Sequence, residues 1–86
     1  MEILRKRLVE ARLRYSRMRS ADGQYGKARA ISRTAASELM GLPSRALQQY
    51  ETGSRKPSAE SLAKIARFYG CSVDYLLGLT DNRERR

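Results

Sequence analysis

Cationic side chains are the chemically active groups that dominate this 86-residue sequence. Ten Lys and Arg side chains stand in residues 1–33 against three acidic ones, whereas residues 34–82 are balanced and residues 83–86 add a charge of +2. The net charge of the whole chain is +9. Phosphate groups attract Lys and Arg because binding releases counterions. Two interpretations of the charge are open: it binds a polyanionic partner, or it only keeps the protein soluble. The size and position of the charge favour a polyanionic partner.

Catalytic and metal-binding groups are scarce. The sequence has no histidine, and Cys71 is its one cysteine, so it lacks the residues for an internal disulfide, a zinc site or histidine-based catalysis. No apolar run is long enough to span a bilayer, and the N-terminus does not resemble a secretion signal. We expect a cytoplasmic protein that is not an enzyme and that uses no metal or cofactor.

The apolar pattern predicts an all-α chain that begins with a long helix over residues 2–19. Apolar side chains recur there at alternating spacings of four and three residues, which places on one face Leu4, Leu8, Ala11, Tyr15 and Met18. The remaining faces are basic, and Arg5, Arg12 and Arg19 fall nearly on one line. The glycines and polar residues of 20–26 then predict a loop, and residues 27–31 are ambiguous.

Capping residues place four shorter helices, so that the chain is expected to have five. Ser32 is the expected N-cap of a helix over 33–40, which Gly41 ends, and Pro43 starts a helix over 43–51. Ser58 and Ser72 are the expected N-caps of a fourth helix, which Gly70 ends, and of a fifth over 73–77. These helices are expected to bury Ala36, Leu39, Met40, Leu47, Tyr50, Leu62, Ile65, Ala66, Tyr69, Val73, Leu76 and Leu77. One domain over 1–81 and a charged, frayed tail over 82–86 follow.

Residues 32–81 resemble the Cro/C1-type helix-turn-helix family, also called the XRE or lambda-repressor-like family. The resemblance rests on the Gly41-Leu42 turn, the run Tyr50-Glu51-Thr52-Gly53-Ser54-Arg55-Lys56-Pro57-Ser58, the segment Leu62-Ala63-Lys64-Ile65-Ala66, and the ending Asp74-Tyr75-Leu76-Leu77-Gly78-Leu79-Thr80-Asp81. It implies a five-helix lambda-repressor-like DNA-binding domain. The helix-turn-helix motif would occupy residues 33–51, and the recognition helix residues 44–51.

The resemblance also implies which side chains face double-stranded DNA. Base contacts are expected from Ser44, Arg45, Gln48 and Gln49. Arginine can pair with guanine and glutamine with adenine, although outside this motif the same residues would be ordinary polar surface. Contacts with the DNA backbone are expected from Arg12, Arg33, Arg55 and Lys56.

Two residues depart from the family pattern. Arg33 stands where the family often has glutamine; an arginine still reaches phosphate, but the bridge that a glutamine amide makes to the recognition helix is not carried over. Pro43 stands where the family tends to have serine or threonine, and it has no hydroxyl to hold a phosphate, so that contact is not carried over either. Glu51 is expected to be structural, because this glutamate commonly pairs in the family with an arginine of the first helix, for which Arg12 is the candidate.

The connection between the first two helices is the largest departure, because it is more than ten residues longer than the family usually has, from about Arg17 to Ala30. Its basic side chains are Arg17, Arg19, Lys27 and Arg29. Two interpretations stay open: a basic arm that touches the DNA backbone or a minor groove, and a flexible loop that only adds charge.

The sequence thus predicts a sequence-specific transcription regulator, a repressor that binds an inverted-repeat operator as a homodimer. The dimer surface is expected near the fifth helix and Leu79. The alternative is an antitoxin or phage-type adaptor whose main partner is another protein.

Overall fold

The computed structural model describes residues 2–20 and 30–84, and within them it contains five α helices and no strand. The helices are α1 (Glu2–Ser20), α2 (Arg33–Leu39), α3 (Ala46–Thr52), α4 (Ala59–Tyr69) and α5 (Val73–Leu76). The predicted all-α fold with a long first helix is confirmed. None of the described helices is long and apolar enough to cross a membrane.

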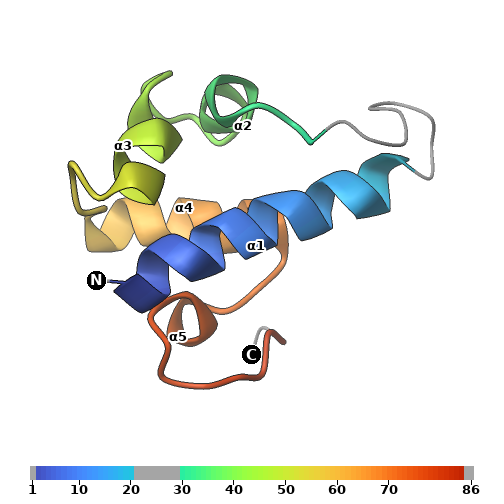
Figure 1. The fold of residues 1–86 in the computed structure, drawn as a ribbon, viewed down its shortest axis with the longest axis vertical. Helices are drawn as coiled ribbons and strands as arrows, with labels where there is room; N and C mark the ends of the chain where they lie inside the picture. The colour runs from blue at the N-terminus through green and yellow to red at the C-terminus, as the bar shows by residue number, and fades with distance from the viewer. Residues whose placement is uncertain (1, 21–29, 85–86) are drawn as a thin grey trace.

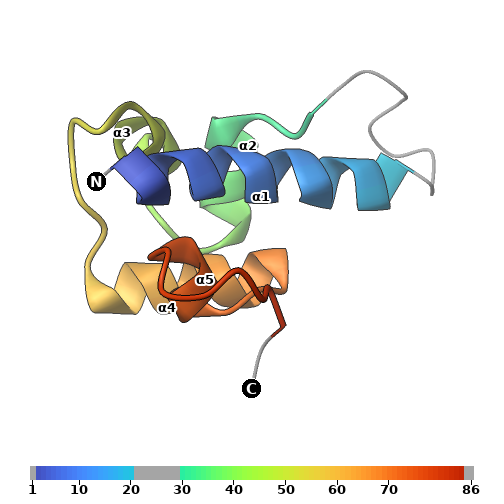
Figure 2. The ribbon, with the colours of Figure 1, turned by 60° about the horizontal axis from the view of Figure 1, so that its bottom comes forward.

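Helix α1 is the spine of the fold, and the shorter helices pack around it (Figure 1). It contacts α3, α4 and α5, while α2 packs on α3. In the turned view α1 and α4 lie one above the other, with α5 across the side that faces the viewer (Figure 2). One side chain from each of four helices is 0% exposed at the centre of the core: Leu8, Leu47, Ile65 and Leu76. Burying a leucine or isoleucine stabilises the fold by about 2 kcal/mol, so these four contacts anchor the arrangement.

Three serines cap the helices that they were predicted to cap. The hydroxyls of Ser32, Ser58 and Ser72 accept hydrogen bonds from the third backbone N–H of α2, α4 and α5, at 3.0, 3.1 and 3.0 Å. Each cap satisfies a donor that the helix itself cannot satisfy. These contacts are local, which explains why the sequence pattern located them.

The start of the third helix was predicted too early. Residues 43–45 form a turn rather than helix, and Ala46 N–H donates to the carbonyl of Pro43 at 2.9 Å. Proline is compatible with the first turn of a helix, but its φ angle fits a turn as well, so residue type alone does not decide between them.

Leu39 was predicted to be buried and is 61% exposed. The buried face of α2 consists of Ala36, Ser37 and Met40. Consecutive residues of a helix are 100° apart, so Ala36, Ser37 and Met40 share one face and Leu39 projects outside it. Val73, Tyr50 and Leu77 are only partly buried, although they pack against the core.

The tail that was predicted to fray begins at residue 82, and the structure instead folds residues 81–84 back onto the helices. The Asp81 carboxylate accepts a hydrogen bond from Arg7 at 2.8 Å, and the Arg83 carbonyl accepts one from the N–H of Ser72 at 3.1 Å. The Arg7 guanidinium also lies over the ring of Tyr75, 4.1 Å from its centroid, which is a cation–π contact. The segment after α5 is therefore attached to α1.

Candidate nucleic-acid interface

The turn between α2 and α3 is tight and places the two helices side by side (Figures 1 and 2). Gly41 has a φ angle of +79°, a left-handed conformation that residues with a side chain disfavour. Ser37 holds both sides of the turn, because its carbonyl accepts the Leu42 N–H at 2.9 Å and its hydroxyl accepts the Leu47 N–H at 3.0 Å. The orientation of α3 on α2 is thus held by directed hydrogen bonds as well as by apolar packing.

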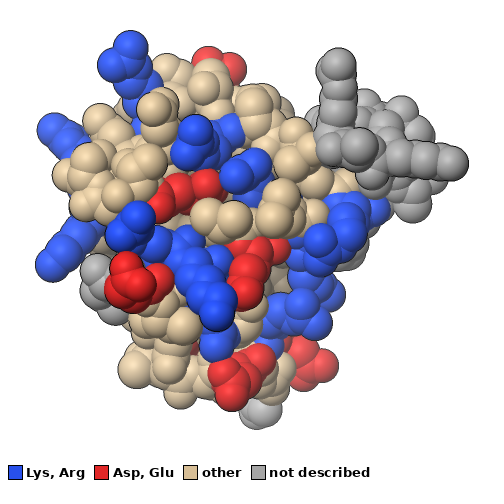
Figure 3. Space-filling view, viewed as in Figure 1, with Lys and Arg blue, Asp and Glu red and all other residues tan. Residues whose placement is uncertain are grey.

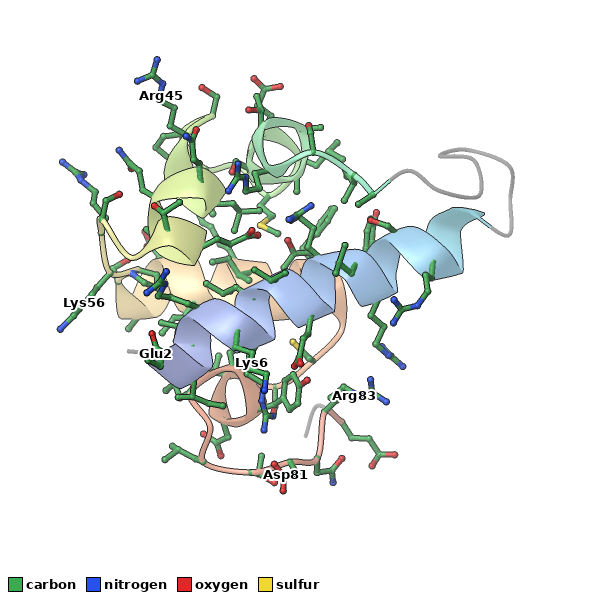
Figure 4. The ribbon with its side chains drawn as sticks, viewed as in Figure 1. Glu2, Lys6, Arg45, Lys56, Asp81 and Arg83 are labelled. Atoms are coloured by element: carbon green, nitrogen blue, oxygen red, sulfur yellow. The ribbon has the colours of Figure 1, made fainter. Side chains whose placement is uncertain are left out.

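The four side chains predicted to contact bases lie together at the N-terminal end of α3. Ser44 and Arg45 belong to the turn before the helix, and Gln48 and Gln49 to its first turn. Gln49 is half-buried and the other three are exposed. Arg45 points away from the molecule (Figure 4). None of the four side chains makes a hydrogen bond within the described part of the chain, so their polar groups are available to a ligand.

Three of the cations predicted to contact a DNA backbone lie on the segments before and after the turn and α3. Arg33 is the first residue of α2, and Arg55 and Lys56 lie in the loop that follows α3, where both are exposed. The Arg55 N–H donates to the carbonyl of Gln49 at 3.2 Å, which attaches this loop to α3. Lys56 extends into solvent on the same side of the molecule as Arg45, on the left in Figure 4 but lower down. None of these three cations forms an ion pair within residues 2–20 and 30–84.

Arg12 and Glu51 form the pair that the family resemblance implied. The Glu51 carboxylate is 3% exposed and accepts from Arg12 Nε at 2.9 Å and from Nη2 at 3.1 Å. The third nitrogen, Nη1, donates to the carbonyl of Ile31 at 3.1 Å. Because the Arg12 guanidinium is turned inward and engaged at every nitrogen, we assign it to supporting α3 and do not retain the predicted contact with a DNA backbone.

Arg5 is a further support of α3 that sequence reasoning missed. Its Nε donates to the backbone carbonyl of Glu51 at 3.1 Å, and its side chain lies against Gly53, which ends α3 with a φ angle of +84°. A cation at a helix C-terminus binds free carbonyls and opposes the helix dipole. The signal was present in the sequence, since Arg5 precedes Arg12 by two helical turns on the same line of α1.

The predicted basic arm lies mostly outside the described residues. The structure does not describe Lys27, Arg29 or the side chain of Arg19. Arg17 belongs to α1 and is exposed. The described end of the connection is attached to α1, because the Ile31 N–H donates to the buried hydroxyl of Ser16 at 2.8 Å. The long connection therefore returns to α1 before α2 begins.

Lys and Arg side chains are spread over the face drawn in Figure 3, both around the α3 end and along α1, with acidic groups among them. The cationic side chains of this face thus extend beyond the surface of α3.

Comparisons with known proteins agree with this geometry. A helix-turn-helix family model matches residues 27–76. The uncharacterized HTH-type transcriptional regulator YobD of Bacillus subtilis (strain 168) is 39% identical over 59 residues, which cover 69% of this chain and 53% of that protein. The chain thus matches only about half the length of this relative. No solved structure matches. Since the family model covers more than half of the chain and the matched range includes α2, the turn and α3, the protein belongs to the Cro/C1-type helix-turn-helix family of DNA-binding transcriptional regulators.

Proposed function

We propose that this chain binds double-stranded DNA sequence-specifically and regulates transcription. The observation that carries the proposal is the N-terminal end of α3, where Ser44, Arg45 and Gln48 are exposed, while the far end of this helix is fixed by the buried Glu51. An α helix fits the major groove, where arginine recognises guanine and glutamine recognises adenine. The rigid support matters because base recognition requires side chains to be held in a defined position.

Affinity and specificity come from different residues in this proposal. Arg33, Arg55 and Lys56 contact phosphates and set the register on the duplex, while Arg45 and Gln49 read base edges. The basic arm, with Arg17, Arg19, Lys27 and Arg29, adds affinity that does not depend on sequence. Deleting residues 20–28 is then expected to lower the affinity for DNA and to flatten its salt dependence. An unchanged salt slope contradicts the role of the basic arm but not the proposed function of the domain.

The finer proposal is a repressor that binds an inverted repeat as a homodimer. One recognition helix contacts only a few base pairs, and two-fold symmetry doubles the site that is read. Leu79, which is 73% exposed, and the partly exposed Ile3 lie near each other, because Ile3 packs against the neighbouring Gly78. They offer a small apolar surface to a second copy.

The adaptor alternative finds less support. A protein partner of α1 needs a continuous apolar patch, and the large apolar side chains exposed on the described part of α1 are Ile3 and Leu13. They are ten residues apart, which is about 15 Å along a helix. Single exposed apolar residues are common and do not mark an interface.

Selection of bound sequences from a random DNA pool, at two salt concentrations, tests the proposal. We expect one inverted repeat to be enriched, and the Arg45→Ala variant to enrich it poorly. Equal recovery of all sequences at both salt concentrations contradicts sequence-specific binding. Enrichment of a single half-site without a repeat contradicts the homodimer only.

A further inference from the structure

The N-terminus of α3 has no cap of its own. Arg45 occupies the N-cap position and makes no side-chain hydrogen bond to the helix, whereas α2, α4 and α5 are each capped by the serine that precedes them. The Ala46 and Gln49 N–H groups bond to the carbonyls of Pro43 and Arg45. The Leu47 N–H belongs to the first turn of α3, where no carbonyl of the helix itself can accept it.

Ser37 of α2 satisfies this donor. Its hydroxyl accepts the Leu47 N–H at 3.0 Å, and the Ser37 residue is 0% exposed. The cap of α3 is therefore supplied by the neighbouring helix, across ten positions of sequence. Because the bond is buried, water cannot replace the hydroxyl if it is lost.

The same residue also fixes the other side of the turn. The Ser37 carbonyl accepts the Leu42 N–H at 2.9 Å, so residues 42 and 47 are both tied to one position of α2. Apolar contacts tolerate small sliding and rotation, whereas a hydrogen bond weakens steeply when its angle changes. The Ser37 hydroxyl is thus placed to set the angle at which α3 leaves the turn.

We propose that Ser37 is a positioning residue for base recognition, which caps α3 from α2 and holds Gln48 and Gln49 at the correct angle to the groove. The inference rests on the proposed function as a sequence-specific DNA-binding protein. Ser37 does not touch DNA in this proposal. Its loss tilts α3 and weakens base contacts, while the phosphate contacts from Arg33 and Lys56, which lie on other segments, persist.

Two matched variants of the full chain test this. Ser37→Ala removes the acceptor of Leu47, and Ser16→Ala is the control, because Ser16 is a buried helical serine that accepts the Ile31 N–H at 2.8 Å outside the turn. Amide exchange measured by NMR reports each bond directly. We expect exchange of the Leu47 amide to accelerate about tenfold in Ser37→Ala only, and that of the Ile31 amide in Ser16→Ala only.

Binding to the selected DNA site and to random-sequence DNA separates positioning from general stability. We expect Ser37→Ala to bind the selected site about tenfold more weakly while its affinity for random DNA changes less than about twofold. In Ser16→Ala the ratio of the two affinities stays as in the unmodified chain. An unchanged ratio in Ser37→Ala, or unchanged protection of Leu47, overturns the inference.

Two further outcomes stay distinguishable. If the unmodified chain itself prefers no sequence, the proposed function fails rather than the role of Ser37. If Ser37→Ala does not fold, Ser37→Cys fills the site with a somewhat larger thiol, which is a poorer acceptor than the hydroxyl. Ser37→Cys is then expected to lower the ratio of the affinity for the selected site to that for random DNA. An unchanged ratio in this variant also overturns the inference.

Discussion

Arg12 of α1 donates hydrogen bonds to both carboxylate oxygens of Glu51 in α3, at 2.9 and 3.1 Å, in a site where the Glu51 side chain is 3% exposed. The third Arg12 nitrogen reaches the carbonyl of Ile31, where the long connection returns to α1. One partly buried guanidinium therefore joins α1, the end of α3 and the segment that leads into α2.

Removing one member of this pair is expected to be costly. Arg12→Ala leaves the Glu51 carboxylate buried without its cation, which is expected to lower the free energy of unfolding by about 3 kcal/mol. The double variant Arg12→Met with Glu51→Leu removes both charges, and its free energy of unfolding is expected to fall much less. Urea unfolding measures both, and a double variant that is as unstable as Arg12→Ala contradicts this account.

Two glycines in the same backbone conformation differ in what surrounds them. Gly70 and Gly78 have φ angles of +72° and +80°, but a Cβ atom at Gly70 meets nothing within 4 Å, whereas one at Gly78 lies 2.7 Å from Cγ1 of Ile3. Gly70→Ala is expected to cost about 1 kcal/mol from backbone strain alone. Gly78→Ala is expected to cost about 2 kcal/mol more because of overpacking.

The excess cost of Gly78→Ala should disappear when Ile3 is shortened to alanine in the same chain. Thermal or urea unfolding of the four chains in this cycle gives the coupling between the two positions. Equal costs for Gly70→Ala and Gly78→Ala would mean that the N-terminus of α1 moves away without penalty.

The buried Tyr69 hydroxyl has no hydrogen-bond partner within the described residues. The Tyr69→Phe variant keeps the ring and removes this unsatisfied polar group, so it is expected to raise the free energy of unfolding by about 1 kcal/mol. Urea unfolding at neutral pH measures this, and a loss of stability of that size would show that the hydroxyl has a partner after all.

Tyr69 also predicts a pH dependence. Burial, and then the nearby Glu51 charge, raise the pKa of this hydroxyl well above its ordinary value. The unfolded chain therefore loses the Tyr69 proton first, at about pH 10, and stability falls as the pH rises beyond that value by up to about 1.4 kcal/mol per pH unit. Tyr69→Phe should lose less stability than the unmodified chain between neutral pH and pH values above about 10. Parallel stability curves contradict the prediction.

Arg45 and Lys56 should affect DNA binding differently. Arg45→Ala is expected to weaken binding to the selected site by about 1–3 kcal/mol and to relax its specificity, because a base contact is lost. Lys56→Gln is expected to weaken binding to all sequences alike and to reduce the salt slope by about 1. Fluorescence anisotropy at several salt concentrations measures both. A change in specificity from Lys56→Gln would reverse the assigned roles.

Most of the helices were predictable because their signals are local. Serine caps act on an N–H three residues later, and the apolar spacing of α1 reports one face of one helix. The candidate site was located by residue types in sequence order around Gly41 and Leu42. The first residue of α3 and the burial of Leu39 were not predictable in this way, because they depend on how α2 and α3 pack against their neighbours.

The amino-acid sequence by itself determined the all-α class, the caps, the family and the set of polar side chains at the start of α3. Only the tertiary structure decided how that helix is held. Arg12 binds the Glu51 carboxylate, Arg5 binds the Glu51 backbone carbonyl, and the Ser37 hydroxyl accepts an N–H of the first turn. The contacts of Arg5 and Arg12 join residues 46 and 39 positions apart, and that of Ser37 joins two different helices. Such bonds form only after the chain has folded, because their partners are brought together by burial of the common core and not by local propensity.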